Sequence, residues 1–225
     1  MPLKAVLLDF NGTIINDEPI HRQLIDELLL GENLRPAPKN YRQICLGKSD
    51  RACLLELLAD QGRSIDDIQL QKLLVKKTAA YQQHLGSITE LPIYADLIDF
   101  LDVAQSAGLQ LAIVTGAMRS EVDAVLRQGG LIERFTTIVA CEDVNSGKPS
   151  PTGYLLAADR LQVQPQECLA IEDTFPGLQA AKAANIPVVG IAHTYPFHMM
   201  QRLSNWAVDC FADLELQRIQ YTYGE

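Results

Sequence analysis

Short apolar runs alternate with helical patterns along most of this chain. The first apolar run, at residues 5–8, leads directly into a carboxylate, Asp9, and then into the turn residues Gly12 and Thr13. A continuous apolar run of this length that ends at a turn signal predicts a strand buried on both faces. Because ligands of open parallel sheets bind at the carboxyl ends of the strands, Asp9 is a candidate functional residue.

Residues 16–87 carry helical patterns and no strand pattern. The segment 31–40 contains two prolines and a glycine, which predicts a loop. We therefore predict a small all-helical unit inserted after the first strand, at the edge of the sheet where it can act as a lid. Its helical patterns cover residues 17–30, 50–61 and 65–85.

From Leu91 onwards strand and helix patterns alternate. This order predicts right-handed crossovers and a parallel, doubly wound α/β sheet, and the unbroken apolar runs indicate a sheet covered on both faces. The core domain is then residues 1–15 plus 88–225, and 16–87 is a cap domain. The strand patterns lie at 109–114, 135–140, 168–171, 187–191 and, more weakly, 208–211. The helical patterns lie at 92–108, 120–128, 151–161 and 177–184.

Composition narrows the class of protein. The net charge of −9 argues against a nucleic-acid partner, since such binding depends on clusters of Lys and Arg. We also expect no membrane partner and a cytoplasmic location, because no signal pattern and no long apolar run is present. The cysteines are odd in number and form no C-x-x-C pair, which favours reduced thiols over disulfides or a zinc site. They are Cys45, Cys53, Cys141, Cys168 and Cys210.

Polar residues stand at several predicted strand ends. Taken singly, a strand-end Asp is more often a turn or cap residue than a catalyst, and a lysine before a proline is usually solvated. In a doubly wound sheet, however, the strand ends share one crevice. Carboxylates, a hydroxyl and an ammonium gathered there suit phosphoryl transfer, which depends on positioning and charge stabilisation. The residues are Asp9, Thr115, Lys148, Glu172 and Asp173.

The same residues carry a resemblance to the haloacid dehalogenase superfamily. The insert after the first motif is similar to that of the subgroup containing β-phosphoglucomutase and phosphoglycolate phosphatase. The resemblance implies a Rossmann-like core with a helical cap, and Mg²⁺-dependent chemistry on a small phosphorylated metabolite. It rests on Asp9-Phe10-Asn11-Gly12-Thr13, Val114-Thr115-Gly116, Gly147-Lys148-Pro149 and Ile171-Glu172-Asp173-Thr174, with a hinge-like Asp17-Glu18-Pro19-x-His21.

The resemblance also implies a role for each matching residue. Asp9 becomes the nucleophile that takes the phosphoryl group and a ligand of Mg²⁺. Asn11 ligates the metal through its backbone carbonyl. Asp173 completes the metal site, with Glu172 as a ligand or its direct support.

Further motif residues bind the phosphate or support the site in this resemblance. Thr115 donates a hydrogen bond to the phosphoryl oxygens, with Gly116 beside it in the phosphate-binding turn. Lys148 neutralises charge on the nucleophile and on the phosphate. Thr13 braces the loop that follows Asp9.

One position departs from the family pattern. Active phosphatases and mutases of this kind carry Asp two residues after the nucleophile, where it protonates the leaving oxygen and later activates water. Here the residue is Asn11, and an amide does neither. General acid–base catalysis contributes roughly 10²–10⁴-fold, so an ordinary phosphatase cycle should be slowed accordingly.

Three explanations of Asn11 stay open. The protein is a phosphatase or phosphotransferase for good leaving groups, or one that borrows another acid such as His21 of the cap. Alternatively, it is catalytically weak or inactive and binds a phosphorylated ligand or a protein partner. A third reading places it with dehalogenases or phosphonoacetaldehyde hydrolases, which lack that Asp; the latter need a cap lysine, for which Lys48 is the candidate.

The cap offers few further candidates. Lys48 and Arg51 lie in the segment 47–51, where this subgroup places a substrate-specificity loop, and either could meet a sugar or a second phosphate. His21 could equally be a half-exposed helix residue. The sequence names neither the substrate nor the oligomeric state.

Overall fold

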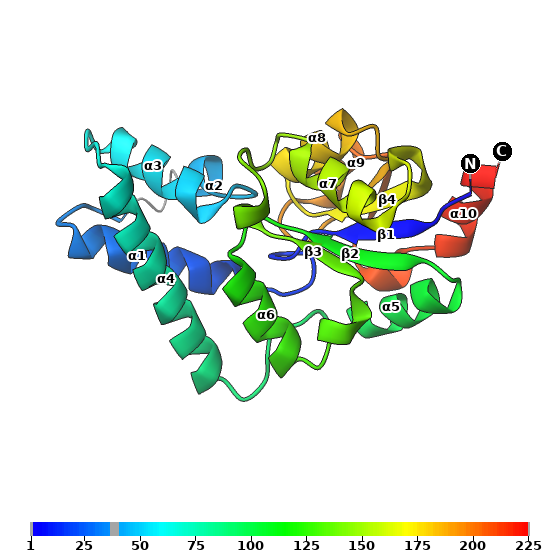
Figure 1. Ribbon diagram of the computed structural model, residues 1–225, viewed down its shortest axis with the longest axis horizontal. Helices are drawn as coiled ribbons and strands as arrows, with labels where there is room; N and C mark the ends of the chain where they lie inside the picture. The colour runs from blue at the N-terminus through cyan, green and yellow to red at the C-terminus, as the bar shows by residue number, and fades with distance from the viewer. Residues whose placement is uncertain (1, 37–40, 225) are drawn as a thin grey trace.

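The computed structural model describes residues 2–36 and 41–224 of the chain (Figure 1). Six strands form one sheet within the described residues: β1 (Ala5–Leu8), β2 (Gln110–Val114), β3 (Thr137–Val139), β4 (Cys168–Glu172), β5 (Val188–Ile191) and β6 (Trp206–Val208). The α-helices are α1 (Glu18–Gly31), α2 (Tyr41–Ile44), α3 (Asp50–Asp60), α4 (Asp67–Ser87), α5 (Leu97–Ser106), α6 (Arg119–Gln128), α7 (Thr152–Leu161), α8 (Phe175–Ala183), α9 (Phe197–Gln201) and α10 (Leu216–Gly224).

The sheet is parallel throughout, with strand order β3-β2-β1-β4-β5-β6. The chain builds outward from β1 through β2 and β3, then crosses back to place β4 on the other side of β1. The strand order therefore reverses between β1 and β4, where Leu8 pairs with Ile171. Ligands of doubly wound sheets bind outside the strands at such a reversal.

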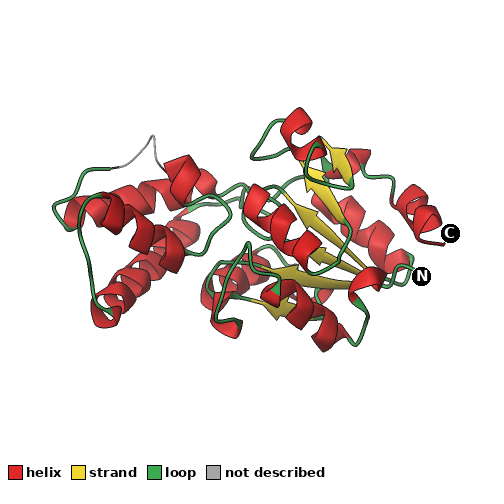
Figure 2. Ribbon diagram, turned by 90° about the horizontal axis from the view of Figure 1, so that it is seen from above, coloured by secondary structure: helices red, strands yellow, loops and turns green. Residues whose placement is uncertain are grey.

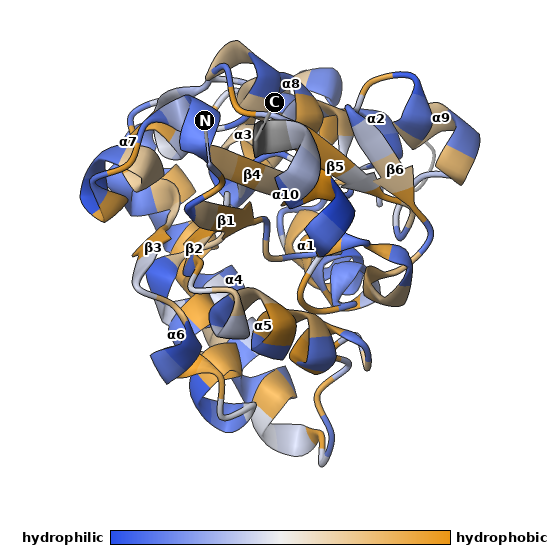
Figure 3. Cartoon of the chain, turned by 90° about the vertical axis from the view of Figure 1, so that its right-hand side faces the viewer, coloured by the Kyte–Doolittle hydropathy of each residue, from blue (hydrophilic) through white to orange (hydrophobic). Residues whose placement is uncertain are grey.

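Alternate residues of β1 pack into separate cores on the two faces of the sheet. Val6 and Leu8 belong to a cluster that includes Phe100 of α5, whereas Leu7 packs with Tyr154 of α7 on the opposite face. Every residue of β1 is buried. This explains why the strand shows a continuous apolar run, and the central strands are coloured as hydrophobic in Figure 3.

Helices α1 to α4 lie together beyond the carboxyl edge of the sheet, apart from the helices that cover its two faces (Figure 2). They have a hydrophobic core of their own, to which Ile25, Leu54 and Leu74 contribute. Among the described residues 16–36 and 41–87 there is no strand. The division into a cap at 16–87 and a core at 1–15 plus 88–225 is consistent with this arrangement and stays a prediction. The predicted loop at 31–40 falls partly outside the described residues.

Two predicted element boundaries are wrong. The helix expected from residue 92 begins only at Leu97, because Ile93 bridges to Ile15 and residues 95–96 form a turn. The sixth strand spans Trp206–Val208 rather than 208–211, since a 3₁₀ helix starts at Phe211. The short helices α2 and α9 carry too few residues for a periodic pattern. No helix in the described part of the chain combines the length and apolar character needed to cross a bilayer.

The expectation of reduced cysteines is wrong for two of them. Cys45 follows α2 and Cys53 lies in the first turns of α3, and the two form a disulfide with a Cα–Cα distance of 4.5 Å. The turn between α2 and α3 brings together residues that are eight apart in sequence, a proximity that no spacing rule indicates. Cys141, Cys168 and Cys210 form no disulfide with any described residue.

The disulfide should contribute to the stability of the cap. Closing a loop of this length removes chain entropy worth about 2–3 kcal/mol from the unfolded state. Cys45→Ser combined with Cys53→Ser should therefore lower the free energy of unfolding by that amount, measured by urea denaturation. Cys210→Ser is the matched control. Equal stability of the double variant and the native protein, each in the oxidised form, would contradict this expectation.

Candidate functional site

The candidate site lies where the strand order of the sheet reverses. Asp9 follows β1, Glu172 ends β4 and Asp173 comes next in the chain. All of these side chains are buried, and one carboxylate oxygen from each lies within 4.8 Å of the others. The adjacency of β1 and β4 therefore brings together carboxylates that are more than half the chain apart.

Lys148 is the cation of this cluster. Its Nζ donates to Asp9 Oδ1 and lies 2.6 Å from Glu172 Oε1. Tyr154 donates a second hydrogen bond to Glu172 Oε1, at 2.6 Å. Burial alone would lower the pKa of Lys148, but Asp9 and Glu172 outweigh it and raise that pKa above its ordinary value. The lysine is thus held charged between two carboxylates.

The carboxylates repel one another strongly. Burial and the charge of Asp9 raise the pKa of Glu172 to about 7, against the lowering effect of Lys148. Burial, Asp9 and Glu172 raise the pKa of Asp173 well above its usual range. One lysine does not offset three buried carboxylates. An all-oxygen donor set with excess negative charge fits a hard divalent cation such as Mg²⁺.

The loop after β1 is shaped around Asp173. Thr13 donates to Asp173 Oδ1 at 3.3 Å, and Thr194 donates to Oδ2. Gly12 has a positive φ of 79°, and a Cβ at this residue would lie 2.0 Å from Asp173 Oδ2. Only glycine leaves room for the carboxylate here. Thr13, the residue predicted to brace this loop, is therefore one of several residues that surround Asp173.

The cap closes directly over the second motif. Thr115 is buried, and its Oγ1 accepts a hydrogen bond from the backbone N–H of Ala117 at 3.0 Å. A Cβ on Gly116 would lie 3.1 Å from the backbone of Ser49, in the loop before α3. The predicted phosphate-binding turn therefore lies in van der Waals contact with the cap.

Asn11 is tied to the cap instead of facing the site freely. Its amide Nδ2 donates to both carboxylate oxygens of Asp17, at 2.9 and 3.1 Å. His21 Nε2 lies 3.1 Å from Asp17 Oδ2 and 3.0 Å from Asn11 Nδ2, and Tyr81 of α4 donates to Asp17 as well. Asp17 is completely buried, so Asn11, His21 and Tyr81 all converge on one enclosed carboxylate.

This cluster holds opposite charges together. Burial raises the pKa of Asp17, but His21, Tyr81 and Asn11 more than compensate, and the net pKa is lowered. Burial and Lys77 lower the pKa of His21, and Asp17 again outweighs them, so the net pKa is raised. His21 is 7% exposed rather than half-exposed, which separates it from an ordinary helix residue.

A buried ion pair links cap and core. Lys77 of α4 lies 2.6 Å from Asp50 of α3 and 3.2 Å from Glu121 of α6. Thr78 donates to the same Glu121 at 2.8 Å. The cavity between cap and core measures about 50 Å³, and it is lined by Asp9, Asn11, Glu18, His21, Lys48, Lys77, Thr115, Lys148 and Asp173 among others.

The structure thus brings most predicted site residues into one cavity, with three qualifications. Glu172 is completely buried and is not among the residues that line the cavity. Lys48 lines the cavity, but its Nζ is paired with Glu56 at 2.7 Å. Arg51 is exposed and bonds Asp67 at 2.8 Å, outside the cavity lining. The sequence missed the partners that complete the site. They are Asp17 as a buried acceptor, Tyr81, Lys77, Glu121, Tyr154 and Thr194. Of these, only Asp17 lies in a motif that the sequence shows, the hinge-like segment that begins with it.

Comparison with known proteins identifies the family. A model described as haloacid dehalogenase-like hydrolase matches residues 3–185. The chain belongs to this family of hydrolases. The resemblance seen in the sequence, and the α/β fold that it implied, are thereby confirmed.

Similar proteins include phosphatases. CbbY of Rhodobacter capsulatus is 33% identical over 198 residues, covering 84% of this chain and 85% of that protein. Fructose-1-phosphate phosphatase YqaB of Escherichia coli is 30% identical over 190 residues, covering 83% and 95%. The crystal structure of an Asp-to-Asn variant of CbbY from Rhodobacter sphaeroides with xylulose-1,5-bisphosphate superposes with a TM-score of 0.85 at 27% identity, covering 95% and 96%.

Gly12→Ala tests the close fit at Asp173. We expect it to lower the free energy of unfolding by about 1–3 kcal/mol and to weaken Mg²⁺ binding, because the new Cβ displaces the carboxylate. Gly130→Ala is the control: its φ is also positive, at 67°, but nothing lies within 4 Å of the new Cβ. Equal Mg²⁺ affinity of both variants in titration calorimetry would contradict the expectation.

The Asp17–His21 pair should make stability depend on pH. Because the folded pKa of His21 is raised above 6.5, its contribution is fully present below pH 6.5 and is lost as pH rises through the folded value. The stability difference between the native protein and His21→Gln should therefore shrink from pH 5.5 to pH 9. Urea denaturation at both values measures it, with His84→Gln in the last turn of α4 as control. A constant difference would refute the pairing.

Proposed function

We propose that this protein is a Mg²⁺-dependent phosphatase acting on a small phosphorylated metabolite, with Asp9 as nucleophile. The observation that carries the proposal is the shared contact of Lys148 with Asp9 and Glu172 inside a cluster of buried carboxylates. Such a cluster is costly unless it holds cations. An ammonium fixed beside the attacking oxygen suits a reaction in which negative charge gathers at that point.

The residues fit a magnesium site. Asp9 and Asp173 would provide carboxylate oxygens, Asn11 its backbone carbonyl, and Glu172 a further oxygen directly or through water. Mg²⁺ prefers such ligands and, when bound, offsets the negative charge of the phosphoryl group. The hydrogen bonds from Thr13 and Thr194 would hold Asp173 in place for this task.

Two displacements make up the proposed reaction. A carboxylate oxygen of Asp9 attacks phosphorus, the bond from phosphorus to the ester oxygen breaks, and the leaving group departs with a proton. Water then attacks the aspartyl-phosphate, which releases inorganic phosphate and restores Asp9. Thr115 would donate to the phosphoryl oxygens, and Lys148 would neutralise the charge shared between phosphate and nucleophile.

Because Asn11 replaces the usual aspartate, the reaction lacks the side chain that normally protonates the leaving oxygen and later activates water. We propose that His21 takes over part of this proton transfer, as donor to the leaving oxygen and then as acceptor from the attacking water. Its Nε2 lies 3.0 Å from the Asn11 amide, and Asp17 outweighs burial and Lys77 to raise its pKa. Both residues line the cavity that contains Asp9.

The substrate class follows from the family and from the cavity. The relatives named above include a fructose-1-phosphate phosphatase and a protein crystallised with a sugar bisphosphate, which supports a small phosphorylated sugar as substrate. A cavity of about 50 Å³ is too small for one, since ligand sites usually measure several hundred Å³. The cap must therefore open to admit substrate. A cytoplasmic location stays part of this proposal.

Hydrolysis of p-nitrophenyl phosphate tests the proposal. Nitrophenolate leaves without a proton, so the native protein should release it in a Mg²⁺-dependent reaction despite Asn11. Asn11→Asp should raise kcat for an alkyl phosphate by roughly 10²–10⁴-fold and have a much smaller effect on the nitrophenyl ester. Steady-state kinetics with both substrates separates the two effects.

Two controls sharpen this test. Asp9→Asn should abolish turnover of both esters, whereas His21→Gln should slow the alkyl ester more than the nitrophenyl ester. No turnover by the native protein, with turnover restored in Asn11→Asp, would sink the proposal. That result would favour a protein that binds a phosphorylated ligand without converting it.

A further inference from the structure

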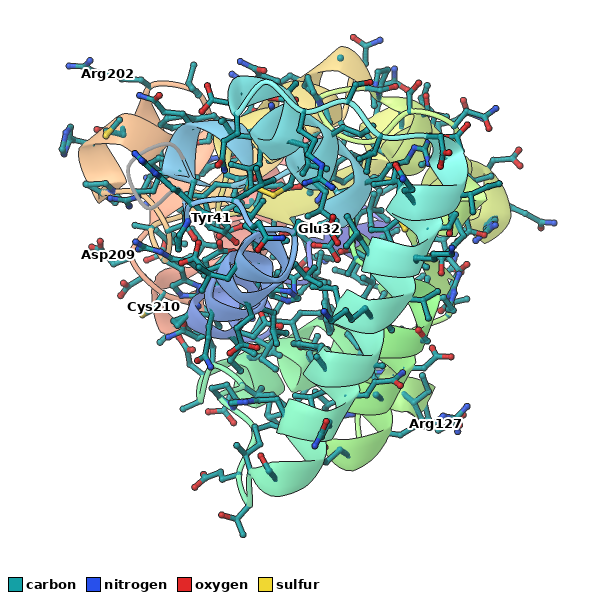
Figure 4. The ribbon with its side chains drawn as sticks, turned by 90° about the vertical axis from the view of Figure 1, so that its left-hand side faces the viewer. Glu32, Tyr41, Arg127, Arg202, Asp209 and Cys210 are labelled. Atoms are coloured by element: carbon teal, nitrogen blue, oxygen red, sulfur yellow. A yellow bond between two sulfur atoms is a disulfide. The ribbon has the colours of Figure 1, made fainter. Side chains whose placement is uncertain are left out.

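The cavity between cap and core has two chemically different ends. Asp9, Thr115 and Lys148 line the end at the sheet, where the phosphoryl group would react. The opposite end is built by α1, α2, α3, α4 and α6, and it would face the rest of the substrate. The ionisable residues that line this cap end are Glu18, His21, Tyr41, Asp50, Lys77 and Glu121. Figure 4 views the molecule from the cap side, where Tyr41 is labelled.

The charge of the cap end is negative. Glu18, Asp50 and Glu121 contribute carboxylates, and the ammonium of Lys77 is already engaged by two of them, at 2.6 Å from Asp50 and 3.2 Å from Glu121. Lys48 also lines the cavity, but both carboxylate oxygens of Glu56 hold its Nζ at 2.7 Å. Among the described lining residues, no lysine or arginine at this end is therefore available for an anionic group.

Buried carboxylate oxygens without a hydrogen-bond partner among the described residues occur on Glu18 and Asp50, and the one on Asp50 lies 2.6 Å from Lys77 Nζ. In the described part of the chain, Glu18 has no such cation beside it. Its Oε1 is buried and accepts no hydrogen bond from any described residue. A buried acceptor without a donor is unfavourable, and a ligand hydroxyl would supply that donor. Burial, together with Asp17 and Asp50, raises the pKa of Glu18, as expected for a carboxylate in an already negative environment.

These contacts indicate which leaving groups the cavity accepts. Hydroxyl groups can donate to Glu18 and Asp50, whereas a second phosphate or a carboxylate would be enclosed beside like charges. Like charges in contact are a common means of excluding a competing ligand. Opening of the cap does not remove this preference, because Glu18 and Asp50 belong to the cap itself.

We propose that Glu18 and Asp50 make this cavity selective for phosphomonoesters whose leaving group is a neutral polyol, such as a monosaccharide monophosphate, against those bearing a second phosphate or a carboxylate. The proposal rests on the proposed phosphatase function and names its substrate class. It distinguishes this chain from the similar CbbY of Rhodobacter sphaeroides, which was crystallised with a bisphosphate.

Matched substrate pairs test the selectivity. Glycerol 3-phosphate and 3-phosphoglycerate differ only by a carboxylate in place of a hydroxymethyl group. Fructose 1-phosphate and fructose 1,6-bisphosphate differ only by the second phosphate. The native protein should show a kcat/KM at least about tenfold higher for the neutral member of each pair. Equal values, or a preference for the anionic member, would overturn the proposal.

Isosteric variants assign the selectivity to residues. Glu18→Gln and Asp50→Asn should each reduce the preference at least threefold by raising kcat/KM for the anionic member. Glu27→Gln is the matched control, because it removes one charge from the exposed face of the same helix as Glu18 and should leave the preference unchanged. If Glu18→Gln and Asp50→Asn both keep the native preference, these residues do not set it.

Failure of the proposed selectivity can be distinguished from failure of the proposed phosphatase function. If the native protein does not hydrolyse p-nitrophenyl phosphate with Mg²⁺, the phosphatase function fails. Titration calorimetry of Asp9→Asn with the same pairs then tests the selectivity without turnover. Tighter binding of the neutral member supports it, and equal or tighter binding of the anionic member refutes it. If hydrolysis occurs but both pairs are converted equally, only the selectivity fails.

Discussion

The close approach of buried carboxylates at the reversal of strand order is the constraint on which the rest of the site depends. Parallel pairing of β1 with β4 places Asp9 beside Glu172 and Asp173, and nothing in the sheet can separate them. Such charges are tolerated only with compensation. Lys148 provides part of it, and the donor set suits a divalent cation for the remainder. The loop after β4, the glycine at residue 12 and the threonines around Asp173 all accommodate this cluster.

The cap is joined to that cluster through further buried charges. Asp17 anchors Asn11, His21 and Tyr81, and Lys77 connects Asp50 of the cap with Glu121 of the core. Networks of this kind are a poor source of stability but define a specific closed arrangement. Breaking and re-forming such ion pairs would let the cap open for substrate and close for reaction.

Asn11 illustrates how one substitution acts through its neighbours. An aspartate at this residue would face the carboxylate of Asp17, whereas the amide donates to it at 2.9 Å. Asn11 and Asp17 can therefore lie in contact in the closed state, whereas two carboxylates at this distance would need to share a proton. The same contact orders His21 at the edge of the cavity, so the group that cannot transfer a proton lies beside one that can. The chemistry at this position depends on the cluster and not on residue 11 alone.

The sequence by itself determined the parallel α/β core, the helical insert and the motif residues at the strand ends, because apolar periodicity and motif spacing are local properties of the chain. It did not reveal the disulfide between Cys45 and Cys53, the pairing of Lys48 with Glu56, or the late start of α5. Those features depend on which segments meet in space. Only the tertiary structure decided that Asp17 is an enclosed anion, that Arg51 faces solvent, and that the cap end of the cavity is acidic, since burial and charge balance arise when cap and core pack together.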